Sequence, residues 1–317
     1  MVPRMPPQEA RLGFVYSAPY RIQGVSVAGE QAVVHVPEFD LAFDIGLCPR
    51  PVLAAPTVAL THTHMDHVGG LPYWFSQRFF QKMPGTARCL VHPAMAEPLR
   101  RMMAAWVDLE RQRTPHEIVP IEPDGEFALK ANLFVRAIEV SHTTPALAFV
   151  VIERRSKLRE EFHGLSQDRL RELRSEGHEI TRTMDIPLVA YTGDTEPGDF
   201  LLRDEFRNAK VVVSECTFFE DEHRDRARIG KHLHIEDFRS LFDAWKAQDV
   251  VIVHVSRRTL MPFARKRIEE IAGPDRSERV HLLMDHRTNR ARHESLMAAA
   301  GEAGREDAAQ PAEGSEK

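Results

Sequence analysis

The chain has 317 residues, of which 43% are hydrophobic and 28% charged, and its formal net charge is -5. This composition excludes a disordered chain, because the apolar surface suffices to offset the entropy of ordering. No apolar run approaches the roughly 20 residues that a membrane-spanning helix needs, and the first residues, MVPRMPPQEA, lack the apolar core of a signal peptide. We therefore expect a cytoplasmic protein with no membrane partner.

Two kinds of sequence pattern, one typical of strands and one typical of helices, alternate along the chain between Arg21 and Leu283. Short runs rich in β-branched residues predict strands, whereas residues 93–110, 234–247 and 259–272 have helical spacing. The strands come first as a meander and are then interleaved with helices, which predicts an α/β fold with two sheets packed together and helices outside. The predicted strands are VSVAG, QAVVHV, LAFDI, TVALTH, RCLVH, NLFVRAIEV, LAFVVIE, PLVAYTGD, AKVVVSE and DVVIVHV.

The domain boundaries follow from composition. Residues 1–18 are expected to form a flexible N-terminus, and residues 19–290 one domain. Residues 291–317 are expected to form a C-terminal segment that ends in a disordered tail, because 301–317 contains no large apolar residue. The three cysteines, Cys48, Cys89 and Cys216, are distant and odd in number, so we expect buried thiols and neither disulfides nor a CxxC metal knuckle.

The segment 60–72, LTHTHMDHVGGLP, brings four side chains of metal-ligand type together directly after a predicted strand. In an extended segment, residues two apart project to the same side, so His62 and His64 are placed to hold one ion. Asp66 and His67 follow the bend and reach a neighbouring ion. The glycine pair after them lets the backbone turn tightly into the next helix.

A two-metal site needs further ligands, and three later strands each end in one. His142 follows FVRAIEVS, Asp194 ends PLVAYTGD and His254 ends DVVIVH. Any one of them alone is better explained as a capping or structural residue. In the order His, Asp, His after an H-x-H-x-D-H motif, they reinforce one another and predict a two-metal centre.

Together these motifs resemble the metallo-β-lactamase superfamily and, within it, the ribonuclease Z family of tRNA 3′-processing endonucleases, with similarity to its short plant-like form. The resemblance runs from about Pro19 to Met284. A Glu-x-Thr-Phe segment paired with a His-x-His helix start separates this family from members of the superfamily that act on lactams, lactones or thioesters. The segments that carry the resemblance are LAFDIG, THTHMDHVGGLP, AYTGDT, SECTF, KHLHIEDF and VHVSRR.

The resemblance implies an αββα four-layer sandwich with two Zn²⁺ ions per chain at the edges of the sheets. Asp194 would bridge the ions, and Asp44 would orient their ligands from outside. The local sequence also explains Asp44 as a turn residue before Gly46. One ion would be bound by His62, His64 and His142, and the other by Asp66, His67 and His254.

The chemistry that the resemblance implies is hydrolysis of a phosphodiester. Two zinc ions supply hydroxide at neutral pH and neutralise charge on the phosphate. Asp66 would orient that hydroxide or take its proton, and His232, held by Glu215, would protonate the departing ribose oxygen. Without the resemblance, His232 is a residue just ahead of a helix and Glu215 a buried strand-end carboxylate. His234 is expected to be structural.

The segment 154–182 interrupts the alternation of strands and helices, because it has few core-sized residues and a charge at every second or third position. Its composition fits either a solvated pair of surface helices or a protruding arm. Members of the ribonuclease Z family grip precursor tRNA with a segment inserted between the third and fourth ligand motifs, where this one lies. The resemblance therefore implies an arm that contacts tRNA phosphates through Arg154, Arg155, Lys157 and Arg159.

The implied function is that of a dizinc endoribonuclease that cleaves precursor tRNA 3′ of the discriminator nucleotide, leaving a 3′-hydroxyl on the tRNA and a 5′-phosphate on the trailer. The family usually forms homodimers. Two departures concern how the 3′ end is seated. After His142 the chain has TTPALAF where the family usually has Gly and an aromatic residue, and Thr259 stands where the last motif usually has Tyr.

Two other functions compete with this one. A phosphodiesterase or other hydrolase of small molecules would keep all the ligands but would not need the arm. A binding scaffold that has lost catalysis would have little use for the intact carboxylates Asp66 and Asp194.

Overall fold

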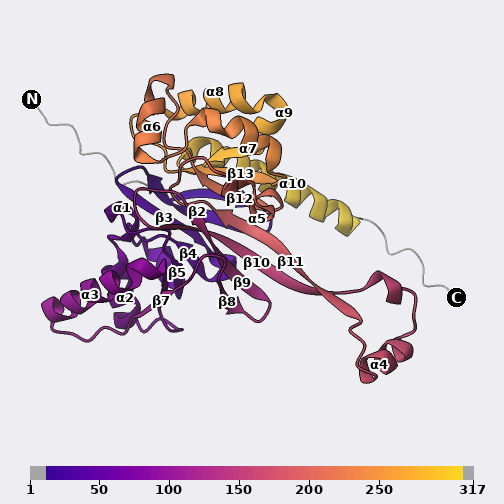
Figure 1. Ribbon diagram of the computed structural model, residues 1–317. Helices are drawn as coiled ribbons and strands as arrows, with labels where there is room; N and C mark the ends of the chain where they lie inside the picture. The colour runs from indigo at the N-terminus through magenta and orange to yellow at the C-terminus, as the bar shows by residue number, and fades with distance from the viewer. Residues whose placement is uncertain (1–11, 310–317) are drawn as a thin grey trace, which may run out of the picture.

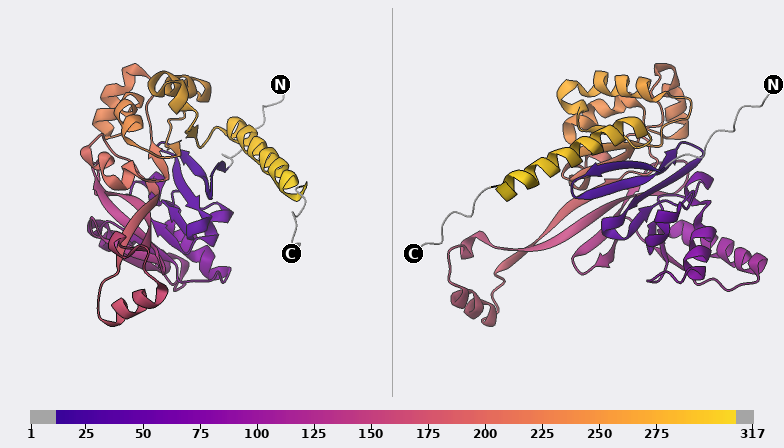
Figure 2. Two further views of the ribbon diagram at one scale, coloured as in Figure 1. Left: turned by 90° about the vertical axis from the view of Figure 1, so that its right-hand side faces the viewer. Right: turned by 180° about the vertical axis from the view of Figure 1, so that it is seen from behind.

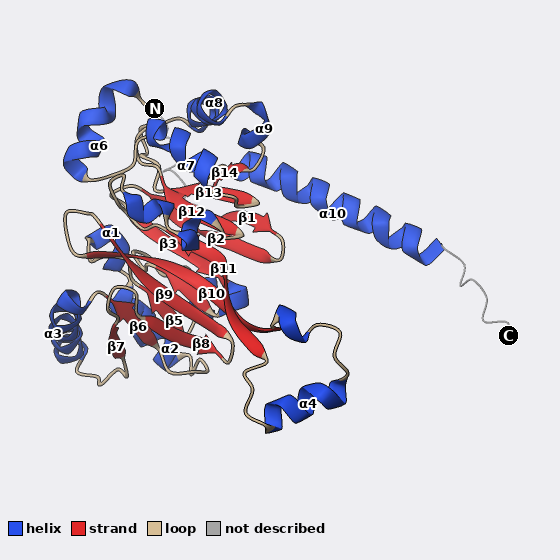
Figure 3. Cartoon of the chain, turned by 45° about the vertical axis from the view of Figure 1, so that its right-hand side comes forward, coloured by secondary structure: helices blue, strands red, loops and turns tan. Residues whose placement is uncertain are grey.

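The computed structural model describes residues 12–309. Two seven-stranded sheets pack face to face, and helices cover the outer face of each (Figures 1 and 3). The α/β sandwich predicted from the sequence is therefore confirmed. No helix within residues 12–309 is long and apolar enough to cross a membrane.

The first sheet is an antiparallel meander that continues into parallel strands from β4 onward. Residues 13–17, which we expected within a flexible N-terminus, form strand β1, because alternate side chains of GFVYS are buried against the body. Residues 1–11 lie outside the described part. The strands are β1 (Gly13–Ser17), β2 (Tyr20–Val27), β3 (Gln31–Val36), β4 (Leu41–Phe43), β5 (Thr57–Ala59), β6 (Arg88–Val91) and β7 (Glu117–Pro120).

The second sheet repeats this plan, with antiparallel pairing up to β11 and parallel pairing after it. Parallel strands place their carboxyl ends at one edge of a sheet, where functional loops gather. Its strands are β8 (Glu126–Lys130), β9 (Leu133–Val140), β10 (Ala146–Leu158), β11 (Thr181–Tyr191), β12 (Val211–Glu215), β13 (Asp249–Val253) and β14 (Val280–Leu282).

The longer helices of the body bury apolar faces against the two sheets. Of the helical predictions, 93–110 coincides with α3, while the other two are shortened to α7 and α8 with neighbouring turns. The helices are α1 (Met65–Val68), α2 (Leu71–Phe80), α3 (Pro93–Glu110), α4 (Gln167–Ser175), α5 (Asp204–Arg207), α6 (Arg224–Gly230), α7 (Phe238–Ala244), α8 (Met261–Ala272), α9 (Pro274–Ser277) and α10 (His286–Ala309).

Three apolar cores hold the four layers together. The central core lies between the sheets, where the rings of Phe43 and Tyr191 stack at 4.9 Å. Trp74 belongs to the core between the first sheet and α2 and α3, and Trp245 to the core between the second sheet and its helices. The three cysteines are buried and free, as predicted.

Two segments leave the body (Figures 1 and 2). Strands β10 and β11 stay paired as far as Leu158 and Thr181 and form the stalk of an arm that carries α4 at its far end. The second segment is α10, which follows the edge strand β14 and extends toward the same side of the molecule as the arm in Figure 1. Residues 301–309, expected to be disordered, are helical, because their alanines, their glutamates and Arg305 favour a helix. Residues 310–317 lie outside the described part.

Candidate metal centre

The predicted ligands converge where strands of both sheets end. His62 and His64 follow β5, and Asp66 and His67 lie in the single turn of α1, which places them past the bend. His142 follows β9, Asp194 follows β11, and His254 follows β13.

Three histidines form one cluster. Nδ1 of His64 lies 3.0 Å from Nε2 of His62 and 3.2 Å from Nε2 of His142. Two nitrogens that bind one tetrahedral zinc at ordinary bond lengths stand roughly 3.3 Å apart, so this spacing suits a shared ion. Burial lowers the pKa of all three imidazoles, most strongly that of His62, which keeps them neutral and leaves their lone pairs free for a metal.

A second cluster adjoins the first. Nε2 of His254 lies 3.4 Å from Nε2 of His67 and 3.4 Å from Oδ2 of Asp66. Oδ2 of Asp194 lies between the clusters, 3.2 Å from Nε2 of His67, 3.3 Å from Nε2 of His254 and 3.8 Å from Nε2 of His62. One carboxylate oxygen therefore faces imidazoles of both groups, as a bridging ligand does.

The opposite ring nitrogen of several histidines is fixed by a partner. Nδ1 of His67 contacts Oδ2 of Asp44 at 2.9 Å, and Nδ1 of His142 donates to the carbonyl of Lys231 at 3.0 Å. Nδ1 of His254 lies 2.9 Å from Oγ1 of Thr217. Such partners set the tautomer and aim Nε2 at a metal.

Asp44 is fully buried and has four hydrogen-bond contacts. Besides His67, it accepts from the N–H and the hydroxyl of Thr61, both at 2.8 Å, and from the hydroxyl of Tyr191 at 2.9 Å. It adopts a left-handed backbone conformation with φ of 57°, consistent with a turn before Gly46. The turn role and the orienting role proposed from the sequence are therefore compatible.

The charges of the second cluster call for a cation. Although burial opposes charge on His67, the carboxylates of Asp194 and Asp44 hold the pKa of its imidazole well above the usual value. Burial likewise opposes charge on Asp194, but His254 and His67 hold its pKa well below normal. Buried carboxylates that stay ionised need a compensating positive charge, which protonated His67 or a divalent metal in place of its proton can supply. The donor set therefore fits a metal centre.

His232 and Glu215 lie together beside both clusters. Nδ1 of His232 contacts Oε1 of Glu215 at 3.0 Å, and Glu215 also accepts from the N–H of Thr195 at 2.9 Å and the hydroxyl of Thr217 at 2.7 Å. Burial works against the imidazolium, but the Glu215 carboxylate outweighs it and raises the pKa of His232 to about 9. His234 accepts at Nδ1 from the N–H of Glu236, which is the structural role predicted for it.

The hairpin of β2 and β3 contacts both Asp66 and His254 of the second cluster, which the sequence did not indicate. The N–H of Gly29 donates to Oδ2 of Asp66 at 2.9 Å, and the N–H of His254 donates to the hydroxyl of Ser26 at 2.9 Å. These are contacts between residues far apart in the chain, and no motif marks Ser26 or Gly29.

The four arm cations lie away from this centre, on β10 and the segment after it. Three of them are ion-paired: Arg154 with Asp185 and Glu126, Arg155 with Glu153, and Arg159 with Glu179. Within residues 12–309, Lys157 has no acidic partner.

Known proteins resemble this chain in sequence and in structure. Residues 48–255 match the family model described as a β-lactamase superfamily domain. The chain is 31% identical over 256 residues to "tRNase Z TRZ1" of Arabidopsis thaliana, covering 79% of this chain and 89% of that protein. It is 28% identical over 244 residues to "tRNase Z TRZ2, chloroplastic" of the same plant, covering 75% and 68%.

Among solved structures, the metallo-β-lactamase fold protein YhfI from Bacillus subtilis superposes with a TM-score of 0.56 at 14% identity. The match covers 86% of this chain and 95% of that one. At this identity the likeness concerns the fold.

Gly46 offers a test of how tightly the ligand segment is packed. A Cβ there would lie 1.6 Å from the carbonyl oxygen of Asp66, so Gly46→Ala must displace the backbone that carries this ligand. We expect Gly46→Ala to lose at least about 2 kcal/mol of the free energy of unfolding in urea. Gly301→Ala in α10, with open space around it, is the control and should be neutral or slightly stabilising. Wild-type stability of Gly46→Ala would contradict this packing.

Proposed function

We propose that this chain, which belongs to the ribonuclease Z family of the metallo-β-lactamase superfamily, works with two Zn²⁺ ions and cuts precursor tRNA directly 3′ of the discriminator. It is a metal-dependent endoribonuclease of tRNA 3′ processing. The observation that carries the proposal is the position of Asp194, whose Oδ2 faces His62 of one cluster and His67 and His254 of the other. Two ions that share a carboxylate suit the in-line displacement of a phosphodiester.

We assign the ligands from the donor atoms that face one another. His62, His64 and His142 would hold one ion, Asp66, His67 and His254 the other, and Asp194 would bridge them. Asp44 would orient His67 and stay outside the ligand set. When bound, the ions supply hydroxide at neutral pH and offset the negative charge that develops on the phosphate.

The protein's own groups would handle the protons. Asp66, whose Oδ2 is fixed by the N–H of Gly29, is placed to orient the attacking water or accept its proton. His232 is placed to donate to the departing ribose 3′-oxygen, because Glu215 favours its protonated form. Thr195 and Thr217 hold Glu215 and thereby the imidazole.

The arm would bind the body of the precursor tRNA. Its projection away from the body, seen in Figure 1, suits recognition of a shape common to all tRNAs, through phosphates and not base edges. Lys157, with no acidic partner in the described chain, and Arg155 and Arg159, on exposed ion pairs, would make these contacts. Exposed ion pairs are weak and exchange readily for phosphates. We also propose that the protein forms a homodimer and acts in the cytoplasm.

Mapping the ends produced from a labelled precursor tRNA by the purified protein tests this function. The proposal requires a mature tRNA that ends in the 3′-hydroxyl of the discriminator, and a trailer with a 5′-phosphate. Rapid turnover of a small phosphodiester with no cleavage of precursor tRNA would favour the rival small-molecule hydrolase instead.

The bridging role of Asp194 predicts a loss of metal. Asp194→Ala should bind well below two zinc ions per chain, measured by elemental analysis after dialysis, and should abolish cleavage. Asp199→Ala, a change at an exposed carboxylate in the same loop region, is the matched control and should keep its metal. Normal metal content and full activity of Asp194→Ala would refute the bridge.

The role of His232 predicts a loss that depends on the leaving group. His232→Ala should keep its zinc and its affinity for tRNA but lose roughly 10²- to 10⁴-fold in kcat on precursor tRNA. A nitrophenyl phosphodiester, whose leaving group departs without a proton, should be cleaved almost as well as by the wild type. Glu215→Gln should show the same selectivity in milder form. Equal losses on both substrates, or lost metal, would mean that the proton comes from elsewhere.

The arm can be shortened without disturbing the sheet. Replacing residues 159–180 by Asn-Gly keeps the last pair of the stalk, Leu158 with Thr181, and closes it with a two-residue turn. We expect KM for precursor tRNA to rise about tenfold or more and its salt dependence to flatten. Turnover of the small diester should not change. An unaltered KM and salt slope would show that the arm does not bind RNA.

A further inference from the structure

The arm joins the body at a ring of four alternating charges on four neighbouring strands. Arg136 on β9 contacts Glu126 on β8 at 2.5 Å and Asp185 on β11 at 2.8 Å. Arg154 on β10 contacts the same two carboxylates, Asp185 at 2.8 Å and Glu126 at 3.0 Å. Each charge therefore has two partners of opposite sign, and the ring spans β8 to β11.

The ring lies where the stalk of the arm leaves the sheet. The pairing of β10 with β9 ends at Glu153, opposite Leu133, one residue before Arg154. Beyond that point β11 is the only described strand that pairs with β10, and Asp185 lies directly opposite Arg154, whose N–H still donates to the carbonyl of Asn132 in the turn before β9. The guanidinium of Arg154 also covers the ring of Phe134 at 4.5 Å, so this side chain reaches back over the body from the first residue of the stalk.

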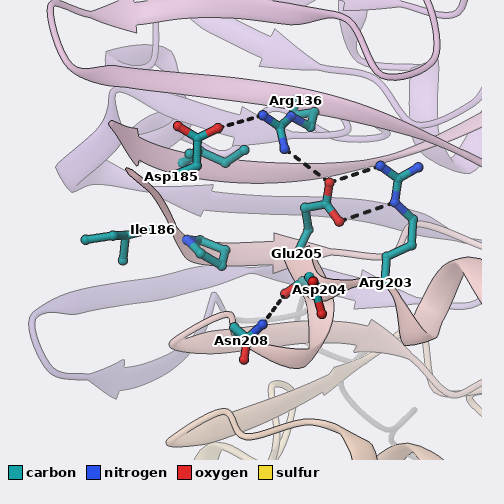
Figure 4. Close-up of a pocket in the computed structure, with 9 residues that line it drawn as sticks. Arg136, Asp185, Ile186, Arg203, Asp204, Glu205 and Asn208 are labelled. Carbon is teal, nitrogen blue, oxygen red and sulfur yellow. Dashed lines mark hydrogen bonds and ion pairs between the residues drawn. The ribbon is translucent and has the colours of Figure 1, made fainter. Parts of the chain in front are cut away.

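A further ion pair ties the ring to the neighbouring helix. Glu205 in α5 contacts Arg136 at 3.1 Å and Arg203 at 3.0 Å, and Figure 4 shows this chain of contacts from Asp185 to Arg203. The residues surround a groove of about 730 Å³, but its two arginines are already paired with carboxylates, so we assign no ligand to it.

The ring differs from the isolated ion pairs on the rest of the arm. The side chains of Arg136, Glu126, Asp185 and Arg154 are 20%, 24%, 30% and 33% exposed, whereas Glu179, the partner of Arg159, is 79% exposed. Half-buried charges in a network are less screened and hold one geometry better than exposed pairs. Hydrogen bonds, first from Arg154 and then from Arg136, lower the pKa of Asp185.

We propose that this ring is a brace that fixes the direction of the arm relative to the metal centre, and that Arg136 and Arg154 are positioning residues for the RNA substrate. A two-stranded ribbon is only marginally stable by itself and bends at its base unless it has lateral support. The brace supplies that support from β8, β9 and α5. Arg154, which we first expected to contact RNA, thus acts through the arm and not on phosphates.

The link to RNA rests on the proposed function, whereas the brace itself does not. The arm and the metal centre would bind two parts of one substrate, so the stiffness between them sets the effective concentration of the scissile bond at the centre. A fixed arm keeps that concentration high. An arm that swings at its base lowers it without any change at the metal ligands.

The brace is tested by distance measurement between two spin labels in the full chain. Gln167→Cys on α4 and Ala104→Cys on α3 are exposed labelling sites, and the three native cysteines are buried. Asp185→Asn and, separately, Glu126→Gln should broaden the distribution of distances between the labels in pulsed electron resonance. Glu153→Gln is the matched control, because its ion pair with Arg155 lies within β10, and its long contact with Asn132, at 3.5 Å, can be kept by the amide oxygen of Gln. An unchanged distribution in both ring variants, with native stability, would overturn the brace.

The same variants without labels test the consequence for the substrate. Asp185→Asn and Glu126→Gln should raise KM for precursor tRNA about tenfold, leave turnover of a small diester unchanged and keep full zinc content, while Glu153→Gln should behave as wild type. Broader distances with an unchanged KM would overturn the positioning role. If even the wild type does not cleave precursor tRNA, the proposed function fails, and the distance measurement still decides the brace.

Discussion

One buried carboxylate organises the functional end of this molecule. Oδ2 of Asp194 faces His62 and His67, which follow a strand of the first sheet, and His254, which follows a strand of the second. These side chains meet only because the sheets pack face to face with their strand ends at a common edge. A carboxylate in that position stays ionised only if cationic charge surrounds it, and a metal ion held by these residues would supply that charge.

Much of this was predictable from the sequence, because strand ends and ligand-type residues coincide in it. The H-x-H-x-D-H segment and the later His142, Asp194 and His254 are all local signals, and the structure brings them together. The contacts of Gly29 and Ser26 were not predictable, since they join the ligand segments to a hairpin far away in the chain. Residues 301–309 were expected to be disordered because they contain no large apolar residue. The helix propensity of these residues instead continues α10 to Ala309.

The arm also contains contacts between separate strands that the sequence alone does not predict. Composition alone indicated a charged segment with a basic root, and an arginine there was expected to face a phosphate. The register of β10 and β11 gives Arg154 two carboxylate partners, because it places Asp185 opposite this guanidinium and Glu126 within reach, and we propose that Arg154 positions the arm. Pairing across strands is a property of the sheet, which a single run of residues does not encode. We propose that a half-buried network of charges joins binding by the arm to chemistry at the centre.

The most direct test of this account is a crystal structure of the zinc-loaded chain with an anomalous difference map recorded at the zinc edge. The account predicts two peaks, one among His62, His64 and His142 and one among Asp66, His67 and His254, with the carboxylate of Asp194 between them. A single peak, or peaks that do not contact Asp194, would contradict it.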